Sequence, residues 1–99
     1  MTHMLLSRLA RKYLLTLKDT KQKQRLIQAL REITASPFTC ANITSLSGVP
    51  NGYRRRVGRH RILFTFHAKE NLLRVWIIDL EKDTRKDYAR WMEYILRQL

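Results

Sequence analysis

The sequence predicts an α+β domain in which an N-terminal helical hairpin packs on a small antiparallel β-sheet, followed by a C-terminal helix. Apolar residues recur at helical spacing over residues 6–33, alternate with a period of two over residues 53–78, and return to helical spacing over residues 84–99. Because the chain has only 99 residues, we expect one domain that spans residues 1–99.

The N-terminal third carries two amphipathic helical segments. The first spans residues 6–17, and Ser7 is available to cap its start. Residues 19–20 interrupt the pattern, and the second segment continues through residue 33 until Pro37 ends it. Little chain remains before the first helix, so an N-terminal edge strand would have only His3–Leu5.

The central part of the chain is expected to form a β-meander. Ile43–Leu46 favours a short strand, and a turn signal follows it. Tyr53–Val57 and His60–Phe66 form a hairpin through a two-residue turn, Gly58-Arg59, and Leu72–Ile78 makes the next strand. In the last segment, Thr84 and Asp87 form a capping-box pattern that predicts the start of the C-terminal helix.

The turn fixes which side chains share a face of the hairpin. Arg56 lies opposite Arg61, and Arg55 lies opposite Ile62. Because side chains alternate between faces, Arg54, Arg56 and Arg61 share one face and Arg55 points to the other. Continued across the next turn, the register predicts a core face made of Ile62, Phe64, Phe66, Leu73, Val75 and Ile77.

The charge is strongly positive and unevenly distributed. Twenty Lys and Arg face eight Asp and Glu, which gives a formal net charge of +12. Residues 33–69 hold six basic side chains and no acid, and five of the six are arginines between positions 54 and 61. Such a field attracts polyanions, and the arginine fork binds phosphate at two points. Nucleic acid is the favoured partner, ahead of an acidic protein and of an anionic membrane.

Two arginines directly opposite each other on a sheet repel, at a cost of up to roughly 1 kcal/mol. With no acid nearby in the sequence, an external phosphate is one explanation for the pair Arg56 and Arg61. The alternative is that Arg54 and Arg56 pair with acids of the C-terminal segment, namely Glu81, Asp83 or Asp87.

Other site classes find little support. Cys40 is the single cysteine, and His3, His60 and His67 lack the spacing of metal ligands, so neither a disulfide nor a metal site is expected. The N-terminus has no long apolar run, so we expect no signal peptide or membrane span and a reducing cytoplasm as the location.

The segment Tyr53–Phe64, YRRRVGRHRILF, closely resembles the Y-R-x-R-x-G-x-Y-R-x-x-Y strand pair of RelE/ParE family toxins. Leu46–Gly48 resembles the L-x-G that precedes it, and Arg85–Tyr88 resembles the family's C-terminal R-K-D-x-Y with one residue missing. The resemblance extends from about Leu6 to Tyr94.

The resemblance implies the toxin of a type II toxin–antitoxin pair, with an acidic, amphipathic antitoxin segment as partner. In the RelE branch, the toxin cuts mRNA on the ribosome without a metal or other cofactor. A ribose 2′-hydroxyl attacks the adjacent phosphate and leaves a cyclic phosphate and a 5′-hydroxyl. The ParE branch shares the fold and inhibits DNA gyrase instead. A basic RNA-binding module without catalysis is a third alternative.

The resemblance also suggests roles for single residues. Arg54, Arg56 and Arg61 would hold and neutralise the scissile phosphate, and Tyr88 would orient the nucleophile or stack on a base, although it could equally be a core aromatic. Arg85 is preferred over Lys82 as the group that aids the leaving oxygen.

Further RNA contacts are expected from Arg55, Arg59, Lys82 and Trp76. For Trp76, packing under the C-terminal helix is the commoner outcome. His60 is read as a solvated surface histidine beside the turn, although His60, Glu81 and Tyr88 could each serve as a general base.

Overall fold

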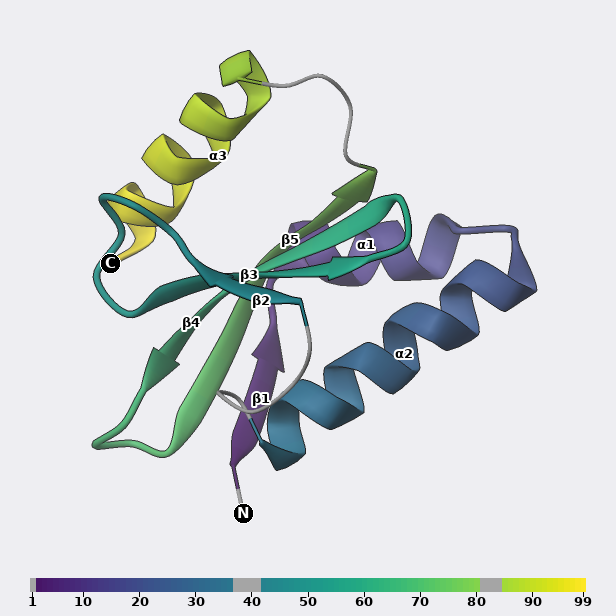
Figure 1. The fold of residues 1–99 in the computed structure, drawn as a ribbon, viewed down its shortest axis with the longest axis horizontal. Helices are drawn as coiled ribbons and strands as arrows, with labels where there is room; N and C mark the ends of the chain where they lie inside the picture. The colour runs from purple at the N-terminus through teal and green to yellow at the C-terminus, as the bar shows by residue number, and fades with distance from the viewer. Residues whose placement is uncertain (1, 37–41, 81–84) are drawn as a thin grey trace.

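The chain combines a helical hairpin, a five-stranded sheet and a C-terminal helix (Figure 1). The computed structural model describes residues 2–36, 42–80 and 85–99, and only the backbone of residues 85–89. No helix within these ranges is long and apolar enough to cross a membrane. The elements are β1 His3–Leu6, α1 Arg8–Thr16, α2 Thr20–Ala35, β2 Ile43–Ser45, β3 Gly52–Val57, β4 His60–His67, β5 Leu72–Leu80 and α3 Arg85–Gln98.

The sheet has the strand order β1-β5-β4-β3-β2. Strands β2 to β5 pair antiparallel, as predicted, but β1 runs parallel to β5, so the sheet is mixed. The predicted antiparallel meander is confirmed for β2 to β5, and β1 adds a parallel edge strand whose direction the sequence pattern did not specify. The connection that leaves β1 passes through both helices of the hairpin, and such a crossover permits a parallel neighbour where a tight turn does not.

The helices cover opposite faces of the sheet. In Figure 1, α1 and α2 lie on one side and α3 lies on the other. The core is divided accordingly. The buried residues under the helical hairpin are Ala10, Leu14, Leu26, Ala29, Leu30, Ile33, Ile62, Phe64, Leu73, Val75 and Ile78. Those between the sheet and α3 are Leu46, Val49, Leu63, Trp76, Ile77 and Ile95.

The two N-terminal helices begin where their capping residues allow. The Ser7 side chain accepts a hydrogen bond from the Ala10 N–H, as the sequence predicted. Asp19 caps α2 in the same way by accepting from the Gln22 N–H. The position of Pro37 and the capping-box pair Thr84 and Asp87 lie outside the described residues and side chains.

The predicted register of the β3–β4 hairpin is confirmed, with Arg56 opposite Arg61 and Arg55 opposite Ile62. Gly58 opens the turn with φ of 59°, a left-handed conformation that glycine adopts without strain. The register predicted for β4 and β5 is correct from the turn as far as Phe64, which pairs with Val75. It is wrong from Leu63 to His60, because a β-bulge shifts the pairing between Leu63 and Phe64.

The bulge changes which residue enters each core layer. Ile77 pairs with Leu63 and packs under α3, whereas the sequence placed it under the helical hairpin. Ile78 takes that place instead, opposite Ile62. The other predicted core residues lie where expected, with Phe66 half-buried at the margin of the hairpin cluster.

Candidate functional site

Strands β3 and β4 bring three of the predicted catalytic arginines to one face, which we call the arginine face (Arg54, Arg56 and Arg61). Arg54 lies opposite Leu63, whose side chain packs in the cluster under α3, so the arginine face is on the α3 side of the sheet. Arg56 is exposed and Arg54 is half-buried. The predicted grouping of the three arginines is therefore present, but only part of it is open to solvent.

Arg61 is fully buried, with a relative exposure of 0%. Its Nε donates to Asp79 Oδ1 at 2.7 Å and its Nη2 donates to Asp79 Oδ2 at 3.0 Å, which is a two-point ion pair. The expectation that no acid relieves Arg61 is wrong. A buried guanidinium without such a carboxylate would be strongly destabilising.

The β-bulge is what brings Asp79 to Arg61. With the regular register, Arg61 would lie opposite Ile78, and Asp79 would lie opposite His60 on the other face. One additional residue in β5 shifts Asp79 to the position directly opposite Arg61. The local alternation of the sequence does not reveal this extra residue, so reasoning from the sequence missed Asp79.

Asp79 also connects the sheet to α3. Trp91 Nε1 donates to Asp79 Oδ2 at 2.9 Å, so one carboxylate accepts hydrogen bonds from both Arg61 and Trp91. The Asp79 side chain keeps a relative exposure of 21%. Docking of the described part of α3 and neutralisation of Arg61 thus depend on the same side chain.

Arg55 lies on the opposite face, as the register predicted. Its Nη2 donates to Glu32 Oε1 of α2 at 2.7 Å, and the whole residue is only 9% exposed. The hydrogen bond and the charge of Arg55 lower the pKa of Glu32 below its ordinary value. Arg55 therefore joins β3 to α2 through an ion pair. Its side chain points away from the face that carries Arg56, where the RNA contact was predicted.

Trp76 is buried in the α3-side cluster at 3% exposure. Its Nε1 donates to Thr65 Oγ1 at 2.8 Å, and the Arg74 guanidinium lies 4.3 Å from its ring centroid. Packing under the C-terminal helix, the commoner outcome for such a tryptophan, is what the structure has. In this arrangement the ring is not available to stack on a base.

His60 was read as a solvated surface residue, and this is wrong. It points to the helical hairpin, is 3% exposed, and its Nε2 lies 2.9 Å from Tyr13 Oη of α1. Its Nδ1 is buried with no hydrogen-bond partner in the described part of the chain. Burial lowers the pKa of His60, although the charges of Asp79 and Asp19 oppose the shift. Burial and the charge of Asp79 both raise the pKa of Tyr13.

We expect His60 to make the stability of the fold depend on pH. Its pKa is lower in the folded than in the unfolded state, so the unfolded chain binds more protons between the two values. The free energy of unfolding should be complete above the ordinary value of 6.5 and fall as the pH drops below it. The melting temperature of wild type should decrease between about pH 7.5 and 5.5, and less so in His60→Gln.

The slope of melting temperature against pH is the readout, because His60→Gln also changes the absolute stability. Both proteins retain His3 and His67, so these residues cannot produce a difference in slope. Glu32, whose lowered pKa also contributes, titrates below this window. Equal slopes for the two proteins would show that His60 is not the source of the pH dependence.

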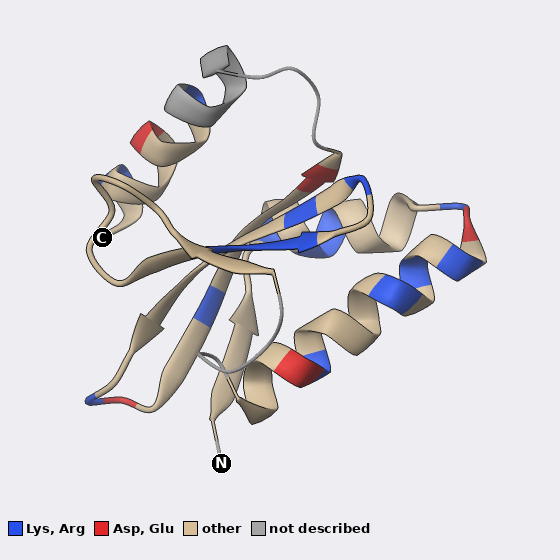
Figure 2. Cartoon of the chain, viewed as in Figure 1, with Lys and Arg blue, Asp and Glu red and all other residues tan. Residues whose placement is uncertain are grey.

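Basic side chains extend well beyond the arginine face. Figure 2 shows them along the β3–β4 hairpin and over α1 and α2. Arg59 is exposed at the tip of the hairpin turn. The exposed cations of the helical hairpin and its connection are Arg8, Arg11, Lys12, Lys18, Lys21, Arg25 and Arg31. A long polyanion could contact both the tip and the helices.

No protein-family model and no curated protein matches the sequence. Solved structures do match it. The isolated E. coli RelE toxin superposes with a TM-score of 0.70 at 21% identity, covering 100% of each chain. RelE in the RelE–RelB complex of Pyrococcus horikoshii gives 0.70 at 16% identity, over 80% of this chain and 93% of that one. The YoeB/ParE toxin of Agrobacterium tumefaciens superposes with a TM-score of 0.72 at 14% identity, over 82% of this chain and 100% of that one.

The chain has the RelE toxin fold. The fold expected from the RelE/ParE resemblance is thereby confirmed. Because the sequence identities are low, the superpositions show the fold alone, and the activity has to be inferred from the residues of the site. Two residues assigned from the resemblance, Arg85 and Tyr88, lie in the first turns of α3, where only the backbone is described. Lys82 lies outside the described residues.

Proposed function

We propose that this chain is the toxin of a type II toxin–antitoxin pair and that it cuts mRNA on the ribosome by the RelE-type reaction. One observation carries the proposal: on a RelE fold with a net charge of +12, the exposed Arg56 and the half-buried Arg54 lie together on one face. Two guanidinium groups on a rigid hairpin can bind a phosphate through paired hydrogen bonds and stabilise the charge that develops on it.

The proposed reaction needs positioning and charge stabilisation, and it needs no metal. The ribose 2′-hydroxyl attacks the adjacent phosphorus, the bond to the 5′-oxygen breaks, and a 2′,3′-cyclic phosphate and a 5′-hydroxyl form. Arg56 and Arg54 contact the phosphate oxygens, whose negative charge is redistributed in the transition state. Because both arginines extend from a sheet strand, little reorganisation is needed when RNA binds.

Arg61 takes a different role from the one that the resemblance implies. Its Nε and Nη2 are directed at Asp79, and its side chain is buried. We therefore assign it to positioning: its ion pair with Asp79 holds β4 and β5 in register, and Arg61 lies on β4 directly opposite Arg56 of β3. Arg85 or Lys82, near the leaving oxygen, and Tyr88, near the nucleophile or a base, remain part of the proposal on the strength of the resemblance.

A ParE-like gyrase inhibitor is the second candidate, and one observation favours it. The carboxylate of Asp79 neutralises one of the three arginines on which an RNA-cutting site would depend. In a gyrase-binding protein the remaining arginines would contribute to a protein interface and would cut nothing. The cytoplasmic location and an acidic antitoxin partner are the same for both candidates.

An antitoxin partner fits the physics of the chain. A domain of net charge +12 favours association with an acidic chain through long-range attraction. The P. horikoshii RelE with the same fold was solved together with RelB. We propose that the partner of this chain is likewise an acidic antitoxin.

Two assays on the purified protein separate the candidates. The first follows mRNA in a translating extract, with ribosome-free RNA as the comparison, and the second follows DNA supercoiling by gyrase. Translation-dependent cuts without gyrase inhibition support the proposal. Gyrase inhibition without cuts would move the assignment to the second candidate, and RNA binding without either effect would leave a non-catalytic module.

A further inference from the structure

α3 is held on the sheet by two kinds of contact. Its later turns pack through Ile95, which is fully buried among apolar side chains of the sheet and of the segment before β3. Closer to the start of α3, Trp91 is half-buried, and its Nε1 donates to Asp79 Oδ2 at 2.9 Å. The apolar contact excludes water without fixing a direction, whereas a hydrogen bond to a carboxylate sets both a distance and an angle.

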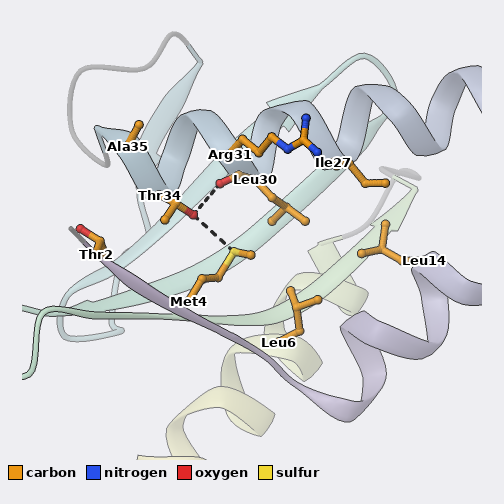
Figure 3. A pocket seen from close by; sticks show the side chains of 9 residues that line it. All are labelled: Thr2, Met4, Leu6, Leu14, Ile27, Leu30, Arg31, Thr34 and Ala35. Carbon is orange, nitrogen blue, oxygen red and sulfur yellow. Dashed lines mark hydrogen bonds between the residues drawn. The ribbon is translucent and has the colours of Figure 1, made fainter.

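The helical hairpin packs on the opposite face of the sheet, and part of that contact is apolar. Figure 3 shows Met4 and Leu6 of β1 pointing toward Ile27 and Leu30 of α2 across a groove of about 780 Å³. The lining of this groove is on the other side of the sheet from the arginine face. The groove is therefore a place to disturb helix packing without touching the bond that α3 makes to the sheet.

The acceptor of that bond is itself held in place. Arg61, which is fully buried, donates to both carboxylate oxygens of Asp79, at 2.7 and 3.0 Å. Two such bonds restrict rotation of the carboxylate, so Trp91 bonds to an oxygen of fixed position. Arg61 in turn lies directly opposite Arg56 of β3. Trp91, Asp79 and Arg61 thus form a continuous series of bonds from α3 to the hairpin that carries Arg56.

The helix extends this fixed point to its first turns. Arg85 and Tyr88, which the proposed function assigns to the RNA, precede Trp91 in the same helix. With a rise of about 1.5 Å per residue, position 88 is less than one turn from the bond to Asp79. A misplacement of about 1 Å can lower the rate of a reaction that depends on positioning by roughly a hundredfold. The bond at Trp91 therefore has a direct effect on where the first turns of α3 lie.

We propose that Trp91 is a positioning residue for the proposed RNA cleavage. Its bond to Asp79 holds the first turns of α3 at a fixed distance from the arginine face, so that groups from both elements meet at one phosphate. Arg61 acts in the same series by fixing the acceptor of that bond. This inference rests on the proposed function for the reaction, and it adds the residue that aligns the two halves of the site.

Trp91→Phe tests the bond, because phenylalanine retains an apolar ring and lacks the N–H donor. At saturating concentrations of ribosomes that carry mRNA, we expect kcat for cleavage to fall about tenfold to a hundredfold. KM should stay within about twofold of wild type, because the groups that bind the substrate are unchanged. A higher KM with an unchanged kcat, or no change in either, would overturn the proposal.

Two control variants separate alignment from general packing. Trp76→Phe removes a bond of the same kind beneath the same helix, but its acceptor is Thr65 Oγ1, at 2.8 Å, rather than Asp79. Ile27→Ala shortens a side chain of the groove on the opposite side of the sheet. Both variants should keep kcat within a few-fold of wild type. A loss in either control as large as in Trp91→Phe would mean that cleavage follows overall packing, and it would refute the specific role of Trp91.

Hydrogen exchange gives a readout that does not depend on cleavage. In a regular helix the amides of residues 89–92 bond to carbonyls of the first turn of α3. These amides should exchange faster in Trp91→Phe than in wild type or in Trp76→Phe. Equal exchange in the three proteins would overturn the proposal, whether or not the wild type cuts RNA.

The same measurements separate this inference from the proposed function. Wild-type cleavage that Trp91→Phe matches would reject only the role of Trp91. A wild type that never cuts, with faster exchange in Trp91→Phe, would reject the nuclease and the positioning role together and leave Trp91 as the anchor of α3.

Discussion

Asp79→Ala is expected to lower the free energy of unfolding by about 3–5 kcal/mol, because it leaves the guanidinium of Arg61 buried without its carboxylate. The hydrogen bond from Trp91, which joins α3 to the sheet, is lost at the same time. Domains of this size have only about 5–15 kcal/mol in total, so a large part of the fold's stability is at stake. Urea unfolding followed by circular dichroism measures the change.

A double variant shows whether the ion pair or the side-chain volume is responsible. Replacing both members, as in Arg61→Leu with Asp79→Leu, removes the charge together with its partner and should recover much of the loss. Asp79→Asn, which keeps an acceptor but no charge, should lie between wild type and Asp79→Ala. A loss below about 1 kcal/mol in Asp79→Ala would show that Arg61 is neutralised by another group.

Arg56→Ala is expected to reduce mRNA cleavage roughly a hundredfold while the fold stays intact. The side chain is exposed, so its removal should change the free energy of unfolding by no more than about 0.5 kcal/mol. Cleavage falls because a donor aimed at the developing phosphate charge is missing. The initial rate of cutting in a translating extract, measured beside the melting temperature, tests both parts.

The control for Arg56→Ala is Arg25→Ala, which removes the same charge from the exposed face of α2. It should retain cleavage within a few-fold of wild type. Arg56→Lys, which keeps the charge but loses the two-point fork, should show an intermediate rate. Unchanged cleavage in Arg56→Ala would remove the arginine face from the mechanism.

The local patterns in the sequence were sufficient for the elements and for the β3–β4 hairpin. A two-residue turn with glycine first leaves one register for Arg56 and Arg61, and the structure has that register. Helical spacing and the Ser7 cap likewise defined α1. Each of these signals depends on residues close together in the chain.

Long-range features could not be obtained in this way. The bulge beside Leu63 arises from how β4 packs on β5, and it alone decides that Asp79 meets Arg61. His60 is buried because Tyr13 of α1 comes to lie beside it, 47 positions away in the sequence. The groove at β1 depends on the parallel pairing with β5, which the pattern of residues 3–6 does not encode.

The chemistry of the RNA ends tests the central claim most directly. We predict that mRNA cut by wild-type protein in a translating extract carries 2′,3′-cyclic phosphate on the upstream fragment and a 5′-hydroxyl on the downstream one. Both ends should form roughly a hundredfold more slowly with Arg56→Ala. Fragments that carry a 5′-phosphate, or an mRNA that stays intact with folded wild-type protein, would contradict a RelE-type reaction on the arginine face.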